Sequence, residues 1–288
     1  MLGRMSDDSG RCPTCGRPRA GNFCAHCGER RLGPHDHTLR HFLAQMLEAF
    51  TNADAKIFLT LRTLVFRPGR LTADSLQGKR KPYIPPLQCF LICNLIFFLL
   101  HPLIDSNTLT TDLHTQLQYT WHKEIAQTLV TARLAVRGVT LEAYTKDFDL
   151  AAVTLAKTLV ILLVPVFSLA VGALYWRQRR YYGAHLIFAL HFCAFWLLLI
   201  SATMALTNLT VRLLRTIGVF PSADLMGRSI IAFSLAIMTS YLFLAVREVF
   251  DREATGVTAL KALALGIALN LALQAYRFGL FFLSYWST

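Results

Sequence analysis

The apolar residues of this chain are gathered into blocks long enough for one helix to cross the hydrocarbon of a bilayer, which takes about 20 residues. Five blocks qualify, and they cover about residues 86–104, 155–176, 183–206, 229–246 and 260–284. Only 16% of the residues are charged, whereas an ordinary soluble domain carries about 25%. The blocks predict an all-α membrane protein with about five transmembrane helices. The fifth block is the weakest, because Lys261 and Arg277 interrupt it.

Basic residues are concentrated before the first block. Residues 1–85 hold 14 Lys and Arg against 7 Asp and Glu, in a chain whose net charge is +12. Residues 105–149, by contrast, hold four basic and six acidic residues. Because cytoplasmic segments beside a membrane carry the basic excess, this pattern predicts a multi-pass protein with a cytoplasmic N-terminus and an outer C-terminus. Topology accounts for the basic charge, so nucleic acid is disfavoured as a partner.

The first apolar block begins only near Pro86, which is too late for a signal peptide. The preceding residues are therefore expected to stay in the cytoplasm. We divide the chain into a metal-binding knuckle at 1–33, cytosolic or interfacial amphipathic helices at 34–85, and a transmembrane domain at 86–288.

Four cysteines form two C-x-x-C pairs separated by a short loop. This spacing offers four thiolates to one tetrahedral metal ion and predicts a zinc ribbon. Gly16 and Gly28 follow the two pairs, where a positive φ lets the backbone fold beneath the sulfur atoms. Four protein ligands leave no open coordination position, so the zinc is expected to be structural. The predicted ligands are Cys12, Cys15, Cys24 and Cys27.

Three alternatives to zinc remain open for these cysteines. Iron occupies similar four-cysteine sites. Two disulfides would need an oxidising compartment, which a cytoplasmic N-terminus does not provide. Redox-active dithiols would be expected within a thioredoxin-like βαβ pattern, which the surrounding sequence lacks.

Two amphipathic helices are expected between the knuckle and the first span. Apolar residues recur at helical spacing over residues 38–50 and 54–66, and Pro68-Gly69 ends the second helix. Lys79, Arg80 and Lys81 then form a basic collar before the first span. The collar is either a plain topology signal or a site for anionic lipid headgroups. A further amphipathic helix at 121–138, with Ile125 and Val136 on its apolar stripe, is expected on the outer surface.

Polar residues within the predicted spans are candidates for function. Asn270, Gln274 and Arg277 recur at helical spacing in the fifth span. They suit either close helix packing with interhelical hydrogen bonds, or the lining of a polar cavity. His185 and His191 in the third span lie six residues apart and do not share a helical face, which disfavours a metal site on that helix alone.

The order of these motifs resembles one group of bacterial membrane proteins known only as a domain of unknown function. The resemblance covers about residues 10–100. It rests on the two cysteine pairs, Thr63-Leu64, Arg67-Pro68-Gly69, Gly78-Lys79-Arg80 and a first span led by proline. Gln usually follows the second knuckle's Gly in that family, whereas this chain has Glu29, which leaves the four ligands intact. The resemblance implies an inner-membrane location and zinc binding, and it implies no activity or catalytic residue.

Three classes of function follow. A closed metal site on a cytosolic end favours a regulatory or scaffolding protein whose knuckle binds a protein partner. A transporter, channel or lipid-handling protein is the first alternative, favoured if Asn94, His185 or His191 shares a cavity with the polar face of the fifth span. A membrane enzyme is the second, although neither a G-x-S-x-G nor an H-E-x-x-H motif is present, and we assign no catalytic residue.

Overall fold

The protein is described here from a computed structural model, which covers residues 11–18, 21–29, 54–104, 109–178, 181–218, 222–250 and 254–288. Its helices are α2 (Asp54–Phe66), α3 (Arg70–Leu76), α4 (Pro86–Ile104), α5 (Leu113–Gln118), α6 (Lys123–Arg137), α7 (Leu141–Leu159), α8 (Leu163–Leu174), α9 (Tyr182–Thr216), α10 (Ala223–Val249) and α11 (Thr255–Ser287). The described residues contain no β-strand, as expected for an all-α membrane protein. The helix expected at 38–50 lies outside them.

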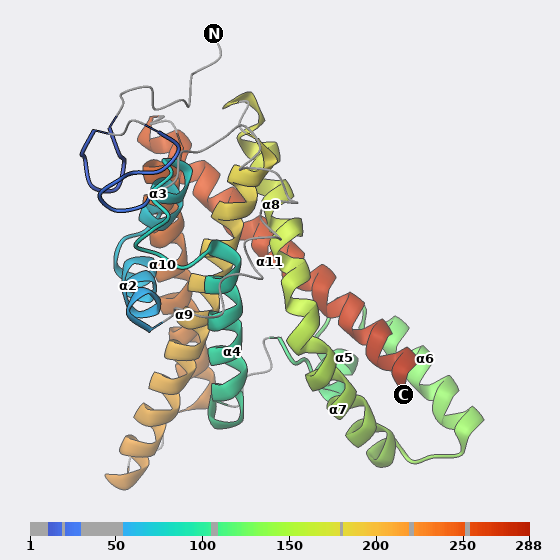
Figure 1. The fold of residues 1–288 in the computed structure, drawn as a ribbon. Coiled ribbons are helices and arrows are strands. Elements are labelled where there is room, and N and C mark those ends of the chain that lie inside the picture. The colour runs from blue at the N-terminus through green and yellow to red at the C-terminus, as the bar shows by residue number, and fades with distance from the viewer. Residues whose placement is uncertain are drawn as a thin grey trace.

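Four of the helical segments are long and apolar enough to cross a membrane: Leu141–Leu174, Tyr182–Thr216, Met226–Val249 and Thr255–Ser287. The fifth predicted span is therefore a continuous helix despite its polar residues. The first predicted span is not among these four. The part of α4 whose side chains are described, Pro86–Leu100, rises about 23 Å at about 1.5 Å per residue, against about 30 Å of hydrocarbon. Figure 1 shows α4, α7–α8, α9, α10 and α11 following one another in alternating directions.

Helix α9 is the central helix of the bundle. In its most apolar stretch of 18 residues, 72% of the residues are buried, against 22% to 33% in the corresponding stretches of the other three spanning segments. It packs against α4, α8 and α10, and its residues 184–197 are almost all buried. A helix that is apolar on all sides is expected at the centre of a bundle, and the others surround it.

The second span begins earlier than the hydropathy predicted. Helix α7 starts at Leu141, where Thr140 caps it by accepting a hydrogen bond from the amide of Ala143 at 3.3 Å. Its first turns carry acidic residues that lower the hydropathy, yet Tyr144 and Phe148 are buried against the end of α11. The helix continues because one face packs, although the other face is polar.

A second, smaller core joins α5, α6, the start of α7 and the end of α11. Helix α6 confirms the amphipathic helix expected at 121–138, and Gly138 ends it at φ 64°. Its buried face, however, carries Ala126 and Val130, whereas Ile125 and Val136 are exposed. The face that packs in the protein is therefore centred on Ala126 and Val130, and the expected placement of the apolar stripe at the outer surface remains a prediction.

Helices α2 and α3 pack on the bundle at the end where the knuckle lies (Figure 1). Leu64 is buried, and Ile57 and Leu61 pack partly against the main core. Phe58 and Phe66, on the outer side of α2, are 71% and 76% exposed. One side of α2 thus joins the protein core, while the other presents aromatic rings outward.

Candidate metal centre

The four predicted ligand cysteines converge on one point. Their sulfur atoms all lie within 4.8 Å of one another. The Sγ atoms of Cys12 and Cys27 are 3.5 Å apart, and those of Cys15 and Cys24 are 3.6 Å apart. A tetrahedral site with Zn–S bonds of about 2.3 Å has sulfur–sulfur edges of about 3.8 Å, so the cluster has the size of such a site. All four are free thiols, since a disulfide would bring two sulfurs to about 2.05 Å.

Each cysteine pair is held by the same backbone turn. The amide of the first cysteine donates to the carbonyl five residues later, at 2.7 Å in one pair and 2.8 Å in the other. The amide of the following glycine donates back to the first cysteine's carbonyl at 2.8 Å in both. Gly16 and Gly28 adopt φ of 73° and 68°, which confirms the expected left-handed conformation. The sequence spacing therefore dictates this local geometry.

The charges in the cluster fit a bound cation. Hydrogen bonds from the backbone amides of Cys27 and His26 lower the pKa of Cys24 to about 6. The amide of Glu29 acts in the same direction on Cys27, but burial and the neighbouring thiols outweigh it and raise that pKa to about 12. The first thiol therefore loses its proton readily, and the negative charge of that thiolate disfavours ionisation of the other thiols. A bound metal cation would offset this repulsion and allow all four to ionise together.

Glu29 fastens the knuckle to the basic collar. The residue is 3% exposed, and its carboxylate accepts hydrogen bonds from the Thr14 hydroxyl at 2.6 Å and from the Lys81 backbone amide at 3.0 Å. The first donor belongs to the knuckle and the second to the collar, 52 residues along the chain. Sequence reasoning missed this role, because a carboxylate beside a metal-binding turn gives no hint of its distant partner.

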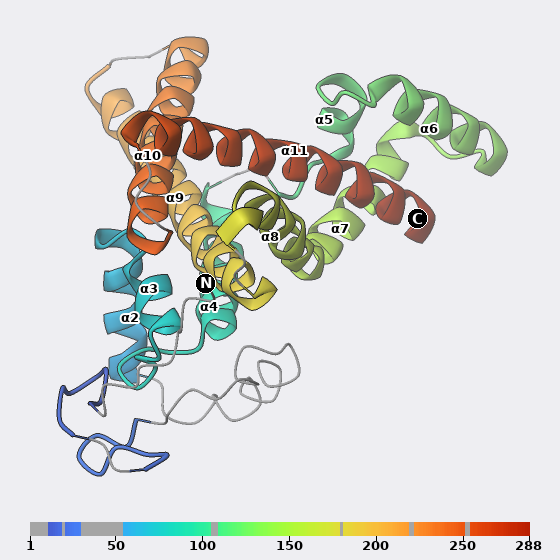
Figure 2. The same cartoon turned by 90° about the horizontal axis from the view of Figure 1, so that it is seen from above.

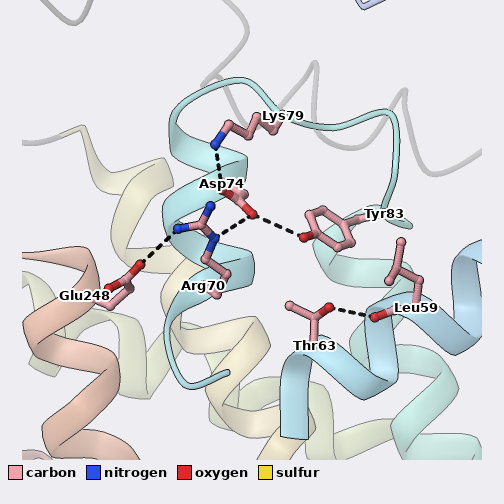
Figure 3. A network of polar contacts seen from close by, with 7 residues as sticks. All are labelled: Leu59, Thr63, Arg70, Asp74, Lys79, Tyr83 and Glu248. Atoms are coloured by element: carbon pink, nitrogen blue, oxygen red, sulfur yellow. Dashed lines mark hydrogen bonds and ion pairs between the residues drawn. The ribbon is translucent and has the colours of Figure 1, made fainter. Parts of the chain in front are cut away.

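Asp74 organises the junction between α3 and the collar (Figure 3). Its side chain is 5% exposed, and its carboxylate accepts hydrogen bonds from Arg70 Nε at 3.1 Å, Lys79 Nζ at 3.2 Å and the Tyr83 hydroxyl at 3.2 Å. Arg70 also reaches Glu248 on α10 at 3.5 Å. Burial, together with the charge of Asp74, raises the pKa of Tyr83, so its hydroxyl stays a donor. The buried carboxylate is therefore satisfied from three directions, as a buried charge requires.

The three collar cations have different surroundings. Lys79 is committed to Asp74, and Arg80 is half-buried with interactions of its own. Lys81 is exposed, and its ammonium lies beside the second knuckle turn, because a Cβ at Gly28 would stand 3.2 Å from Nζ. Among the three, Lys81 is the one whose side chain is most open to an outside partner.

Two further hydrogen bonds join α2 and α3 to the transmembrane helices, and a third joins α2 to the segment before α4. Tyr241 on α10 donates to the Leu64 carbonyl at 2.8 Å. Thr72 and His191 Nδ1, from α3 and α9, are 2.9 Å apart, and both side chains line a small pocket. Within the junction itself, the Thr60 hydroxyl accepts the Ile84 amide at 3.1 Å. The knuckle is thus connected through Glu29, the collar and α3 to three different helices of the bundle.

The three polar residues predicted in the fifth span lie on α11 in different surroundings. Asn270 is exposed, whereas Gln274 and Arg277 are half-buried. The Arg277 backbone carbonyl accepts from the buried Gln116 side chain of α5 at 3.4 Å. Of the residues considered for a shared cavity, Asn94 donates to the Lys157 carbonyl at 3.3 Å and His191 lies beside Thr72. These contacts place the groups in separate surroundings, and the polar-cavity hypothesis remains a prediction.

Comparison with known proteins gives one match. Residues 54–98 match a family described as a protein of unknown function (DUF3667). No curated protein and no solved structure matches the chain. The matched residues comprise α2, α3, the collar and the first part of α4. The chain is therefore similar to this family where the segments before the membrane helices pack on the bundle. The cysteine cluster lies before the matched stretch.

Proposed function

We propose that this chain is a multi-pass membrane protein in which a zinc-bound knuckle on the cytoplasmic side recruits a protein partner in a regulatory or scaffolding role. The observation that carries the proposal is the attachment of the closed four-cysteine cluster, through Glu29, to the collar that leads into the bundle. A partner bound to the knuckle would therefore be held at a fixed place relative to the membrane helices.

Zinc is the metal that suits this site best. Four cysteine sulfurs at tetrahedral spacing favour zinc or iron, and the absence of an open ligand position assigns a structural role. The stretch 11–29 is too short to bury a core of its own, so the metal supplies the cohesion that side-chain packing cannot.

The exposed surface of the knuckle supports a protein partner. Phe23 directly precedes Cys24 of the cluster and is 63% exposed. An aromatic ring on a rigid exposed turn is a typical anchor for a protein interface, because it buries a large area at little conformational cost. Arg17 is also exposed on the knuckle and could contribute to the rim of such an interface.

The orientation in the membrane is supported at both ends of the bundle. The loop between α8 and α9 follows the end of α8 that lies toward the knuckle (Figure 1), and residues 177–182 contain three arginines and no acid. Exposed aromatic rings occur at both ends, as expected at membrane interfaces. They are Trp176, Tyr181 and Tyr182 at the knuckle end, and Tyr119, Trp121 and Trp286 at the other. A reporter at the C-terminus is expected to face the side opposite the knuckle.

A photo-crosslinking amino acid at position 23 tests the recruitment role. In cells, we expect it to form a discrete protein adduct, because the side chain at this position is exposed and directly precedes a cysteine of the cluster. The same probe at Leu235 on α10, which is 51% exposed on an apolar helix, serves as the control and should give lipid adducts only. The proposal requires the position-23 adduct to disappear when Cys24 is replaced by Ser. A knuckle that binds zinc but yields no protein adduct would contradict the recruitment role.

We further propose that the exposed collar cation contacts anionic lipid headgroups. Lys81→Gln keeps the backbone hydrogen bond to Glu29 but removes a charge that contributes about 1 kcal/mol near an anionic surface. In anionic proteoliposomes at low salt, protease should cleave the knuckle about fivefold faster in this variant than in the parent. In neutral proteoliposomes the two should be cleaved equally.

Lys79→Gln is the matched control for that experiment. It removes the same charge two residues away, but from the buried Asp74 network. We expect it to lower the free energy of unfolding by about 1 kcal/mol, while knuckle cleavage depends on lipid charge as in the parent. If neither substitution alters cleavage in anionic vesicles, the collar acts only in topology.

A further inference from the structure

Helix α11 presents an apolar face that no other described helix covers. Figure 2 shows α10 at the N-terminal end of α11, α7 and α8 along one side of it, and α5 and α6 across from them near its C-terminal end. The inner side is closed by Ala262, Leu265, Leu269 and Tyr276, all buried. On the opposite side Leu260, Leu263 and Ile267 are 69%, 52% and 63% exposed.

One amide interrupts this exposed face. Asn270 is exposed, and among the described residues its side chain makes no hydrogen bond. It lies near the middle of the helix, 15 residues after Thr255 and 17 before Ser287. In hydrocarbon there is no water to satisfy an amide, so an outward Asn at this position is costly unless another chain supplies a partner.

The spacing of the face is that of a helix pair. The exposed residues 260, 263, 267 and 270 are separated by steps of three, four and three, which is the repeat that brings two helices together along a seam. A single Asn on such a seam fixes the register of the pair, because its side chain both donates and accepts. A second copy of the chain in the same membrane brings its own Asn270 to the same depth.

We propose that two copies of this protein associate through α11, with the two Asn270 side chains hydrogen-bonded to each other across a two-fold axis along the membrane normal. The occupant of the exposed face is thus a second copy of this chain. This interface rests on the membrane placement proposed above and is separate from partner binding by the knuckle. Paired bundles would present two knuckles on one side of the membrane.

Energy transfer between donor- and acceptor-labelled full-length chains in liposomes measures this association. The parent chain is expected to dimerise, and Asn270→Leu should weaken the dimer about tenfold, because one interhelical hydrogen bond is lost while the apolar seam remains. Ile231→Ala on α10, which changes a residue that is 62% exposed on another helix, is the control and should leave the dimer unchanged.

Two results would overturn the interface: a parent chain that stays monomeric as the protein-to-lipid ratio is raised, or an Asn270→Leu chain that associates as tightly as the parent. Flotation of the same liposomes and the position of the C-terminal reporter show independently whether α11 spans the bilayer. A chain that floats, places its C-terminus outside and remains monomeric contradicts the interface alone. A chain that does not float contradicts the membrane placement.

Discussion

Replacing Cys24 with Ser is expected to abolish metal binding and to unfold the knuckle while the helical bundle remains folded. Elemental analysis should fall from about one zinc per chain to almost none, because three remaining thiolates no longer close the tetrahedron. Structural zinc contributes about 10–16 kcal/mol to the folding of comparable small peptides, which is more than any other single contact in this region can replace. Residues 11–29 should then become readily cleaved by protease.

The bundle should survive this substitution, because neither of its two hydrophobic cores includes a knuckle residue. Circular dichroism is expected to show helix content close to that of the parent. Cys193→Ala is the matched control, since Cys193 is a buried cysteine of α9 outside the cluster and its loss should leave the zinc content unchanged. Purified parent protein that holds two disulfides and no metal would refute the metal site.

The sequence predicts the parts of this molecule that depend on local spacing. The C-x-x-C pairs and their glycines determine the knuckle turns, because each turn closes within six residues. The apolar blocks locate the membrane helices, since length and composition alone decide whether a helix can cross hydrocarbon. The helix at 54–66 and its end at Pro68-Gly69 follow from periodicity and backbone chemistry in the same way.

The sequence does not predict the contacts that assemble these parts. Glu29 and Lys81 are 52 residues apart, and Arg70 and Glu248 are 178 apart, so no periodicity relates them. Periodicity also does not select the face of α6 that packs, because apolar residues lie on both sides of this helix and Ala126 and Val130 are the ones buried in the second core. Long-range partners depend on the tertiary fold, which a local pattern does not contain.

Gly69 both follows the end of α2 and lies directly against the backbone of α10. It has a φ of 78°, and a Cβ at this position would stand 2.7 Å from the Ala245 carbonyl oxygen and 2.8 Å from the Ala245 Cα. Both atoms belong to the backbone of α10, so no side-chain rotation relieves the contact. The absence of a side chain at residue 69 is what allows α3 to approach α10 closely enough for Arg70 to reach Glu248.

Gly69→Ala is therefore expected to destabilise the protein by about 3 kcal/mol, of which about 1 kcal/mol is left-handed strain and the rest is the forced separation of α3 from α10. Gly218→Ala isolates the strain, since Gly218 has the same φ of 78° but no atom within 4 Å of the added Cβ. Thermal unfolding in detergent should show a fall in Tm for Gly69→Ala about three times that for Gly218→Ala. The Gly69→Ala chain should also release the knuckle to protease, because α3 positions the Asp74 network and the collar that holds Glu29. Equal Tm changes in the two variants would mean that α3 can shift at no cost, and that the close approach to α10 does not hold the junction together.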